Sequence, residues 1–228
     1  ARAMRHLAAY QNAAWAQRFE TRVLALRRRE ASLAGGDASL PVTRNAAQSL
    51  LKLMSYKDEY EVARLYSDGS FREKLAEQFE GDLKLEFHMA PPFLARPKNA
   101  HPPAKIRLGG WMLPAMKWLA RGKALRGTAF DLFGHTGERR LERELIERFE
   151  ARLDELMAGL APANQRFAAQ IAAVPLAIRG YGHVKLANLA MARGREAELL
   201  HRFAPERYPR PVVEAKAGQI RGIAVVAQ

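Results

Sequence analysis

The side chains best suited to chemistry are the cations of residues 84–126. This stretch holds nine Lys or Arg residues and a single acid, Glu86, so its net charge is +8 within a chain whose formal net charge is +13. A concentration of one sign of charge attracts partners of the other sign. The anion-binding candidates in this stretch are Lys105, Arg107, Arg121, Lys123 and Arg126. The structural alternative for the last three is stabilisation of a helix C-terminus, where cations complement the helix dipole.

A second candidate anion site is the segment GYGHVK, Gly180–Lys185. Glycines at the start of a helix let backbone N–H groups face an anion, and His183 and Lys185 would add cations. The alternative is a helix start that needs glycine only for its backbone shape. The sequence favours that structural interpretation, because the longer phosphate-binding glycine motifs are missing.

Other chemistries lack the residues that they require. The chain has no cysteine, which excludes disulfides and thiolate-ligated iron–sulfur clusters within these residues. Its six histidines form neither an HxH nor an HExxH pair, and no GxSxG nucleophile motif occurs. We therefore expect no catalytic residue and no metal ligand in this chain.

Aromatic and basic residues alternate in the segment WMLPAMKWLARGKALR. Such a pattern can stack nucleic-acid bases. Trp111 and Trp118, however, lie seven positions apart on an apolar stripe of a predicted helix, which favours burial in the core. Nucleic acid is therefore the less favoured partner.

The elements that position these residues are predicted to be mainly helices. Apolar periodicity predicts a mainly α, multi-helix domain of about seven helices with a small central β-hairpin. A half-buried strand at 83–89 would pair with 105–108, and Thr43, Ser70, Thr136 and Pro162 would begin helices. Helices are predicted at 2–33, at 43–56 with a continuation to 66, at 111–125, at 138–159 and at 162–173. A short helix from 70 would have Phe71, Leu75 and Phe79 buried, and a helix at 183–203 would have Val184 and Leu186 inward.

The most informative stretch is Ala46–Tyr66, where apolar residues flank the charged cluster Lys57-Asp58-Glu59. The placement predicts charges that pair beside a core edge. This stretch, LLKLMSYKDEYEVARLY, and the following QFEGDLKLEFHMAPPFLA resemble the C-terminal domain of the large fused indolepyruvate:ferredoxin oxidoreductases. The resemblance continues through GWMLPAMKWLARGKALRGTAFDLFG, ERRLERELIERFEARLDELMAGLAPAN and IRGYGHVKLANLA, over roughly residues 7 to 203.

The resemblance implies a domain at 1–203, followed by a proline-containing tail, 204–228, that is either an extra strand or disordered. The parent enzyme would be a cytoplasmic, thiamine-dependent oxidoreductase that decarboxylates aryl 2-oxoacids with coenzyme A and passes electrons to ferredoxin. Thiamine pyrophosphate, Mg and iron–sulfur clusters would lie elsewhere in that parent, with none in this segment. Because the chain begins with Ala1, we expect a fragment of a longer protein.

The expected role is structural support and interdomain assembly, with the remaining domains of the parent as partners. Ferredoxin and coenzyme A are the candidate anionic partners. A basic nucleic-acid-binding domain and an oligomerisation module, in which the helices 2–33 and 138–159 pack between subunits, stay open as alternatives. No run of about 18 apolar residues occurs, so we expect no membrane-spanning segment.

Overall fold

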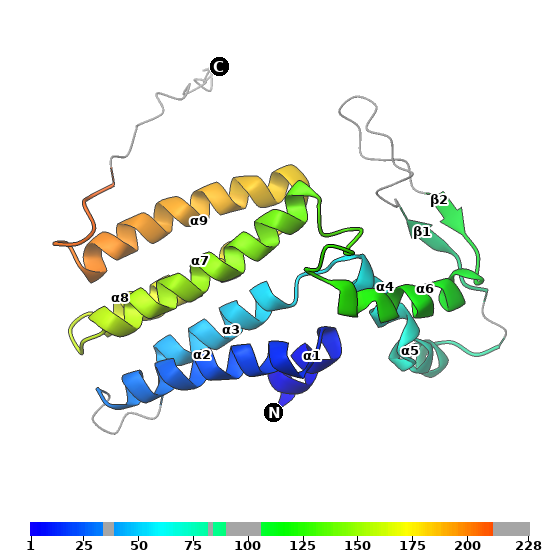
Figure 1. The fold of residues 1–228 in the computed structure, drawn as a ribbon, viewed down its shortest axis with the longest axis horizontal. Helices are drawn as coiled ribbons and strands as arrows, with labels where there is room; N and C mark the ends of the chain where they lie inside the picture. Colours follow the sequence, from blue (N-terminus) through cyan, green and yellow to red (C-terminus); the bar gives the residue numbers. More distant parts are fainter. Residues whose placement is uncertain (34–38, 82–83, 90–105, 212–228) are drawn as a thin grey trace, which may run out of the picture.

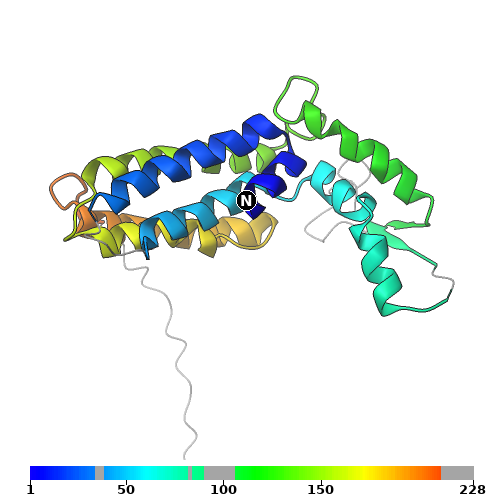
Figure 2. The same ribbon diagram turned by 90° about the horizontal axis from the view of Figure 1, so that it is seen from below.

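The protein is built almost entirely from helices, as predicted. The computed structural model describes residues 1–33, 39–81, 84–89 and 106–211. These residues form nine α-helices, two 3-10 helices and one two-stranded antiparallel sheet. Figure 1 shows a bundle of long helices with a smaller lobe at one end, and Figure 2 shows the same division from below.

The bundle takes its helices from both ends of the described chain. Helix α3 lies at its centre and contacts α1, α2, α7 and α8, while α8 also packs on α9. The bundle elements are α1 (Arg2–Tyr10), α2 (Ala13–Ala31), α3 (Pro41–Met54), α7 (Gly137–Gly159), α8 (Gln165–Ala173), the 3-10 helix η2 (Val174–Ala177) and α9 (Gly182–Phe203).

The smaller lobe comes from the middle of the chain. Helix α6 packs mainly on α4, and α4 also contacts α5. The elements of this lobe are α4 (Glu59–Ser67), α5 (Ser70–Gln78), β1 (Phe87–Met89), β2 (Ile106–Leu108), α6 (Met112–Arg121) and the 3-10 helix η1 (Gly122–Leu125).

The predicted hairpin is present, with shorter strands. Phe87 is opposite Leu108 and Met89 is opposite Ile106 in an antiparallel register. Only Phe87 of the two strands is buried, where it joins a small core with Ala63, Leu113 and Met116. The predicted strand residues Leu83 and Lys105 lie outside the described residues.

Several helices start at other residues than the sequence predicts. The predicted helix 2–33 is two helices, since Asn12 caps α2 by accepting a hydrogen bond from the Trp15 N–H at 2.8 Å. Gly69, with φ at 93°, precedes α5 in place of the predicted Ser70 cap. Helix α8 begins at Gln165, after Asn164, and not at Pro162. Thr136 caps α7 as predicted, accepting from the Arg139 N–H at 3.3 Å.

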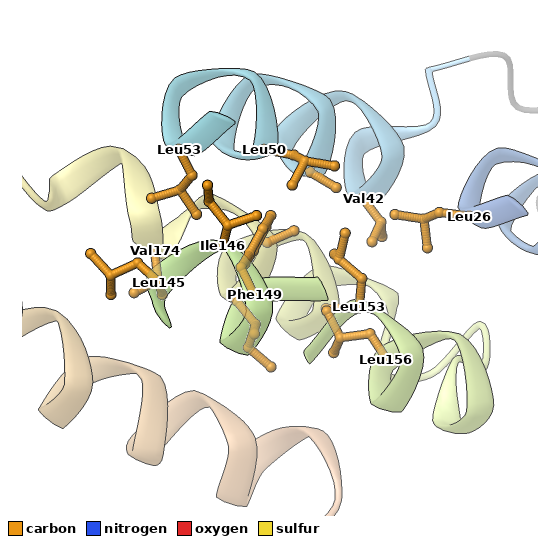
Figure 3. Close-up of a cluster of buried hydrophobic side chains, with 14 of the residues drawn as sticks. Leu26, Val42, Leu50, Leu53, Leu145, Ile146, Phe149, Leu153, Leu156 and Val174 are labelled. Carbon is orange, nitrogen blue, oxygen red and sulfur yellow. The ribbon is translucent and has the colours of Figure 1, made fainter. Parts of the chain in front are cut away.

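The bundle core is formed where the apolar stripes of α2, α3 and α7 meet. Figure 3 shows Leu26, Leu50 and Phe149 among the side chains that converge there. Helix α7 turns an apolar stripe inward, because Leu145, Phe149, Leu153 and Leu156 are all buried. Burying one such side chain contributes about 1.5–3 kcal/mol relative to leaving it exposed.

Polar side chains on α3, at the centre of the bundle, form hydrogen bonds with α8 and η2. Asn45 and Ser49 donate to the carbonyl oxygens of Ala169 and Ala172 at 2.9 and 2.6 Å. One turn further, the Lys52 ammonium donates to the carbonyls of Pro175, Leu176 and Ile178 at 2.8, 3.1 and 2.6 Å. These carbonyls lie where the helical hydrogen-bond ladder ends, so Lys52 satisfies acceptors that would otherwise be left without partners.

A buried acid on α2 caps α3 from a distance. The fully buried Glu30 carboxylate accepts hydrogen bonds from the backbone N–H groups of Val42 and Thr43 at 2.9 and 2.7 Å, and from the Gln165 amide at 3.0 Å. Glu30 therefore does what the sequence predicted for the Thr43 side chain. A negative charge at this end also complements the helix dipole.

The short C-terminal segment after α9 packs back onto the bundle. The Tyr208 hydroxyl donates to Glu155 on α7 at 2.8 Å, and the Tyr208 carbonyl lies 2.9 Å from Nδ1 of His201. The first residues of the predicted tail therefore contact the bundle. Residues 212–228 of the predicted tail lie outside the described residues.

Replacing Glu30 tests whether this capping contact stabilises the bundle. Glu30→Ala leaves two buried N–H groups without their acceptor, so we expect the free energy of unfolding to fall by about 2–4 kcal/mol. Glu20→Ala on the same helix, whose side chain is half-buried, should change it by less than about 0.5 kcal/mol. Urea denaturation followed by circular dichroism measures both. Equal losses in the two variants would contradict the capping role.

Candidate functional site

The predicted anion-binding residues of the central basic stretch fall in separate environments. Arg107 on β2 is exposed, and its Nε lies 3.4 Å from a carboxylate oxygen of Glu86. Lys123 on η1 donates to the carbonyl of Ala9 at 2.5 Å, which ties η1 to α1. Arg121 lies exposed at the end of α6, and Lys105 lies outside the described residues. The structure therefore does not assemble the three described residues of this group into one pocket.

Arg126 is buried in the protein and binds a carboxylate of the same chain. Its Nε and Nη2 donate to the two carboxylate oxygens of Asp58 at 2.6 and 2.8 Å, and both side chains are only 3% exposed. Its Nη1 donates to the Tyr10 carbonyl at 2.7 Å. Every edge of the guanidinium is thus occupied from within the chain, so Arg126 has a structural role in this arrangement.

Aromatic rings surround this ion pair. The Arg126 guanidinium carbon lies 3.9 Å from the centroid of the Tyr10 ring, and the Tyr10 hydroxyl donates to the Tyr56 carbonyl at 3.0 Å. Burial raises the pKa of Tyr10, partly offset by the positive charge of Arg126. The tyrosine therefore stays neutral and acts as a hydrogen-bond donor.

A second buried acid orders the loop that carries Arg126. Asp131 accepts hydrogen bonds from the backbone N–H groups of Gly127 and Gly134 at 2.8 and 3.0 Å, and from the Tyr60 hydroxyl at 3.2 Å. A Cβ on Gly134 would lie 2.3 Å from a carboxylate oxygen of Asp131, so this close approach requires glycine. Burial, reinforced by the Asp131 charge and hydrogen bond, raises the pKa of Tyr60 to about 12.

Together these contacts form a polar junction between the bundle and the smaller lobe. We define the junction by Tyr10, Asp58, Tyr60, Arg126 and Asp131. Tyr10 belongs to α1, whereas Asp58 caps α4 by accepting from the Glu61 N–H at 2.8 Å, and Arg126 follows η1. The junction thus fixes where α6 lies relative to the bundle. Sequence reasoning predicted pairing for the charges around Asp58 but did not identify the partner.

The outer face of α6 differs from its prediction. Trp111 and Trp118 are 64% and 73% exposed, so the expectation that they enter the core is wrong. The buried side of α6 is formed by Leu113, Met116 and Ala120, which face α4. The Arg121 guanidinium lies 4.9 Å from the centre of the Trp118 ring, a cation–π contact at the surface.

Two further hydrophobic assignments also differ from prediction. Val184 and Leu186 of α9 are 47% and 56% exposed, although Leu189, Leu199 and Leu200 of the same helix are buried. Phe79, predicted to belong to a buried stripe, lies just beyond the end of α5 and is exposed.

The GYGHVK segment begins α9. Gly180 and Gly182 have φ values of 88° and 52°, and a Cβ on Gly180 would lie 2.7 Å from a Val184 methyl. The backbone shape therefore accounts for these glycines. Lys185 forms an ion pair with Glu142 on α7, whereas His183 is exposed. The two candidate cations thus do not converge on one point.

The smaller lobe contains a groove that the sequence did not predict. It has a volume of about 670 Å³ between α4, α6 and β1, and apolar side chains such as Tyr66, Phe87 and Met112 form much of its walls. Its size lies within the range of small-molecule pockets. Its lining also takes residues from α5 and α7, so only the arrangement of several separate elements creates it and no local pattern could have indicated it.

Two functional classes can be examined directly in the described part of the chain. No cluster of three or more His, Cys, Asp or Glu side chains is arranged there to hold a metal ion. Within the same residues, no helix has both the length and the hydrophobicity to span a bilayer.

The fold and the junction define a two-lobed helical domain in which each buried charged side chain that the structure describes has a partner within the chain. Residues 1–198 match the model of DUF6537, a family of unknown function, and the chain belongs to that family. No curated protein and no solved structure matches the chain.

Removing Arg126 tests the energetic role of the junction. Arg126→Met leaves Asp58 buried without its counter-charge, so we expect the free energy of unfolding to fall by about 3–5 kcal/mol. Arg121→Met makes the same chemical change at an exposed site five residues earlier and should cost less than about 1 kcal/mol. Denaturant titration of both variants gives the comparison. A small loss at Arg126 would show that the ion pair contributes little.

The raised pKa of Tyr60 makes the folded state less stable at high pH. The unfolded chain releases this proton near the ordinary tyrosine pKa of about 10, whereas the folded chain holds it to about 12. The folded state therefore binds more protons in this window, and stability falls as the pH rises from about 10 to 12. Tyr60→Phe should flatten this fall, whereas Tyr181→Phe, at an exposed site, should not. Unfolding free energies measured across the window would decide, and parallel slopes in all three proteins would contradict the assignment.

Proposed function

We propose that this chain is the C-terminal helical domain of an indolepyruvate-type 2-oxoacid:ferredoxin oxidoreductase and that it serves assembly of the enzyme. The parent would be a cytoplasmic enzyme that oxidatively decarboxylates aryl 2-oxoacids with coenzyme A and delivers electrons to ferredoxin. The proposal rests on the resemblance over roughly residues 7 to 203, which includes several long blocks in the same order.

The blocks that carry the resemblance also supply the junction. The segment LLKLMSYKDEYEVARLY contains Asp58 and Tyr60, and GWMLPAMKWLARGKALRGTAFDLFG contains Arg126 and Asp131. A chain that shares these blocks with the oxidoreductase domain has the means to form the same joint between two lobes. This correspondence supports a shared architecture.

The observation that carries the assembly role is the set of exposed large hydrophobic side chains. Apolar side chains that gather on one part of a soluble protein's surface commonly mark a binding site. They lie on or beside α6, on the loop before α7 and along the N-terminal half of α9. Those exposed by more than 60% are Trp111, Trp118, Phe130, Leu132, Tyr181 and Met191. We assign these surfaces to contacts with other domains of the parent.

The reaction chemistry would belong to the rest of the parent. Iron–sulfur clusters are held chiefly by cysteine thiolates, and this chain contains no cysteine. In the proposal, thiamine pyrophosphate, Mg and the clusters are therefore bound by other domains. Ferredoxin and coenzyme A are partners of the whole enzyme.

The alternative of an oligomerisation module needs different surfaces from those first considered. Helices α2 and α7 bury Phe19, Leu26, Phe149 and Leu153 inside the bundle of a single chain. Their apolar stripes are therefore occupied. A contact between copies would instead use the exposed side chains of α6 or α9, which the assembly proposal assigns to other domains.

The parent activity is tested with the full-length polypeptide that contains this chain. Purified without oxygen, it should reduce ferredoxin when given indolepyruvate and coenzyme A, whereas the 228-residue chain alone should not. Absence of thiamine pyrophosphate and iron–sulfur clusters from the full-length protein would overturn the proposal, as would arylpyruvate oxidation by the isolated chain.

The assembly role is tested by changing one exposed surface. Phe130→Ser combined with Leu132→Ser should leave the unfolding free energy of the isolated chain within about 0.5 kcal/mol, because both side chains are exposed. The same change in the full-length protein should lower its melting temperature and activity. Leu24→Ser, at an exposed position on α2, is the control. Full-length protein unaffected by the double change would remove this surface from the assembly contacts.

A further inference from the structure

The outer face of α6 combines aromatic and cationic side chains in a fixed arrangement. Trp111, at the N-cap position, and Trp118 project from the same side of the helix, seven residues apart. Arg121 stacks over Trp118, and the exposed Lys117 lies beside it in the sequence. Figure 2 shows that α6, drawn in green, runs along the outer edge of the smaller lobe. We refer to Trp111, Lys117, Trp118 and Arg121 as the α6 face.

The charge around this face has one sign. Residues 106–130 contain five Lys or Arg residues and no acid. Arg126 is neutralised by Asp58 inside the protein, and Arg107 lies near Glu86. Among the described residues, no carboxylate pairs with Lys117 or Arg121. These two cations are therefore available to an acidic partner, which defines the charge complementarity of the face.

We propose that the α6 face is a docking site for an acidic segment of a protein partner. The two tryptophans would be apolar anchors, and Lys117 and Arg121 would pair with carboxylates of the partner. Tryptophan and arginine are the residues most enriched among energetically dominant contacts of protein interfaces. The inference rests on the proposed assembly role and names its surface and the chemistry of the partner.

The composition of the face favours a protein over a nucleic acid. Binding of nucleic acid draws most of its affinity from many phosphate contacts, each provided by a Lys or Arg. The α6 face offers two cations without a described carboxylate partner, against two large exposed aromatic side chains. This ratio suits an acidic polypeptide that also presents apolar side chains.

Contacts within the chain hold the α6 face in place in the absence of a partner. Its helix packs on α4 through Leu113, Met116 and Ala120. Just beyond its C-terminal end, Lys123 binds the Ala9 carbonyl and Arg126 binds Asp58. Because the helix is already fixed, binding would lose little backbone entropy, and the anchors would retain more of their contact energy.

The experiment measures binding of a labelled amphipathic peptide whose charged residues are all glutamate and whose apolar residues are leucine and phenylalanine. The full 228-residue chain is titrated into this probe at low salt. Lys117→Glu with Arg121→Glu should weaken binding at least about tenfold, and Trp118→Ala should weaken it about tenfold. Arg193→Glu with Arg195→Glu, at two exposed positions of α9, makes the same charge change and should weaken it less than about twofold.

Three outcomes would overturn the inference. The wild-type chain could fail to bind the peptide, or both double variants could lose equal affinity, which would indicate attraction by net charge alone. An oligothymidylate of the same charge could bind more tightly and depend on the same α6 residues, which would assign the face to nucleic acid. If the wild-type chain fails to bind the peptide while the full-length protein still oxidises indolepyruvate, this inference is removed and the proposed parent activity stands. If the chain binds the peptide but the full-length protein does not oxidise indolepyruvate, only the parent activity is removed.

Discussion

The relative placement of the two lobes depends on Arg126, which pairs with Asp58 at the start of α4 and donates to the Tyr10 carbonyl at the end of α1. Taking both charges out of water costs several kcal/mol per ion, and that cost is offset only when the remaining donors and acceptors are satisfied. Here Asp58 also accepts from the Glu61 N–H and Arg126 also donates to the Tyr10 carbonyl. The geometry therefore specifies one arrangement, because any slip between α1 and α4 would leave a buried charge without its partner.

In the bundle, too, buried polar groups fix the positions of helices that apolar packing alone leaves less defined. Leucine and phenylalanine side chains supply most of the favourable free energy, but similar packing is available to slightly shifted helices. The contacts of Glu30 with the start of α3, and of Lys52 with the end of η2, are directional. They set the register of α3 against α2 and η2.

Local patterns in the sequence were sufficient wherever the deciding contacts are local. The periodic leucines of α7, its Thr136 cap and the central hairpin follow from spacing over a few residues. The break at Asn12 was missed because the apolar stripe continues on both sides of it. Asp58 and Arg126 lie 68 positions apart, and no local pattern identifies such a partner. Their pairing depends on where α4 and η1 lie, which is a property of the completed fold.

Helix α6 shows why periodicity identifies a helix more securely than its buried side. Leu113, Met116 and Ala120 form one apolar set at helical spacing, while Trp111 and Trp118 form another on the opposite side. Both sets satisfy the same pattern, and only the position of α4 decides between them. Because the junction holds α6 with its smaller residues toward α4, the tryptophans are left in solvent. Their exposure therefore follows from how the chain folds, and it leaves aromatic area and positive charge together on the surface, where an acidic partner can use them.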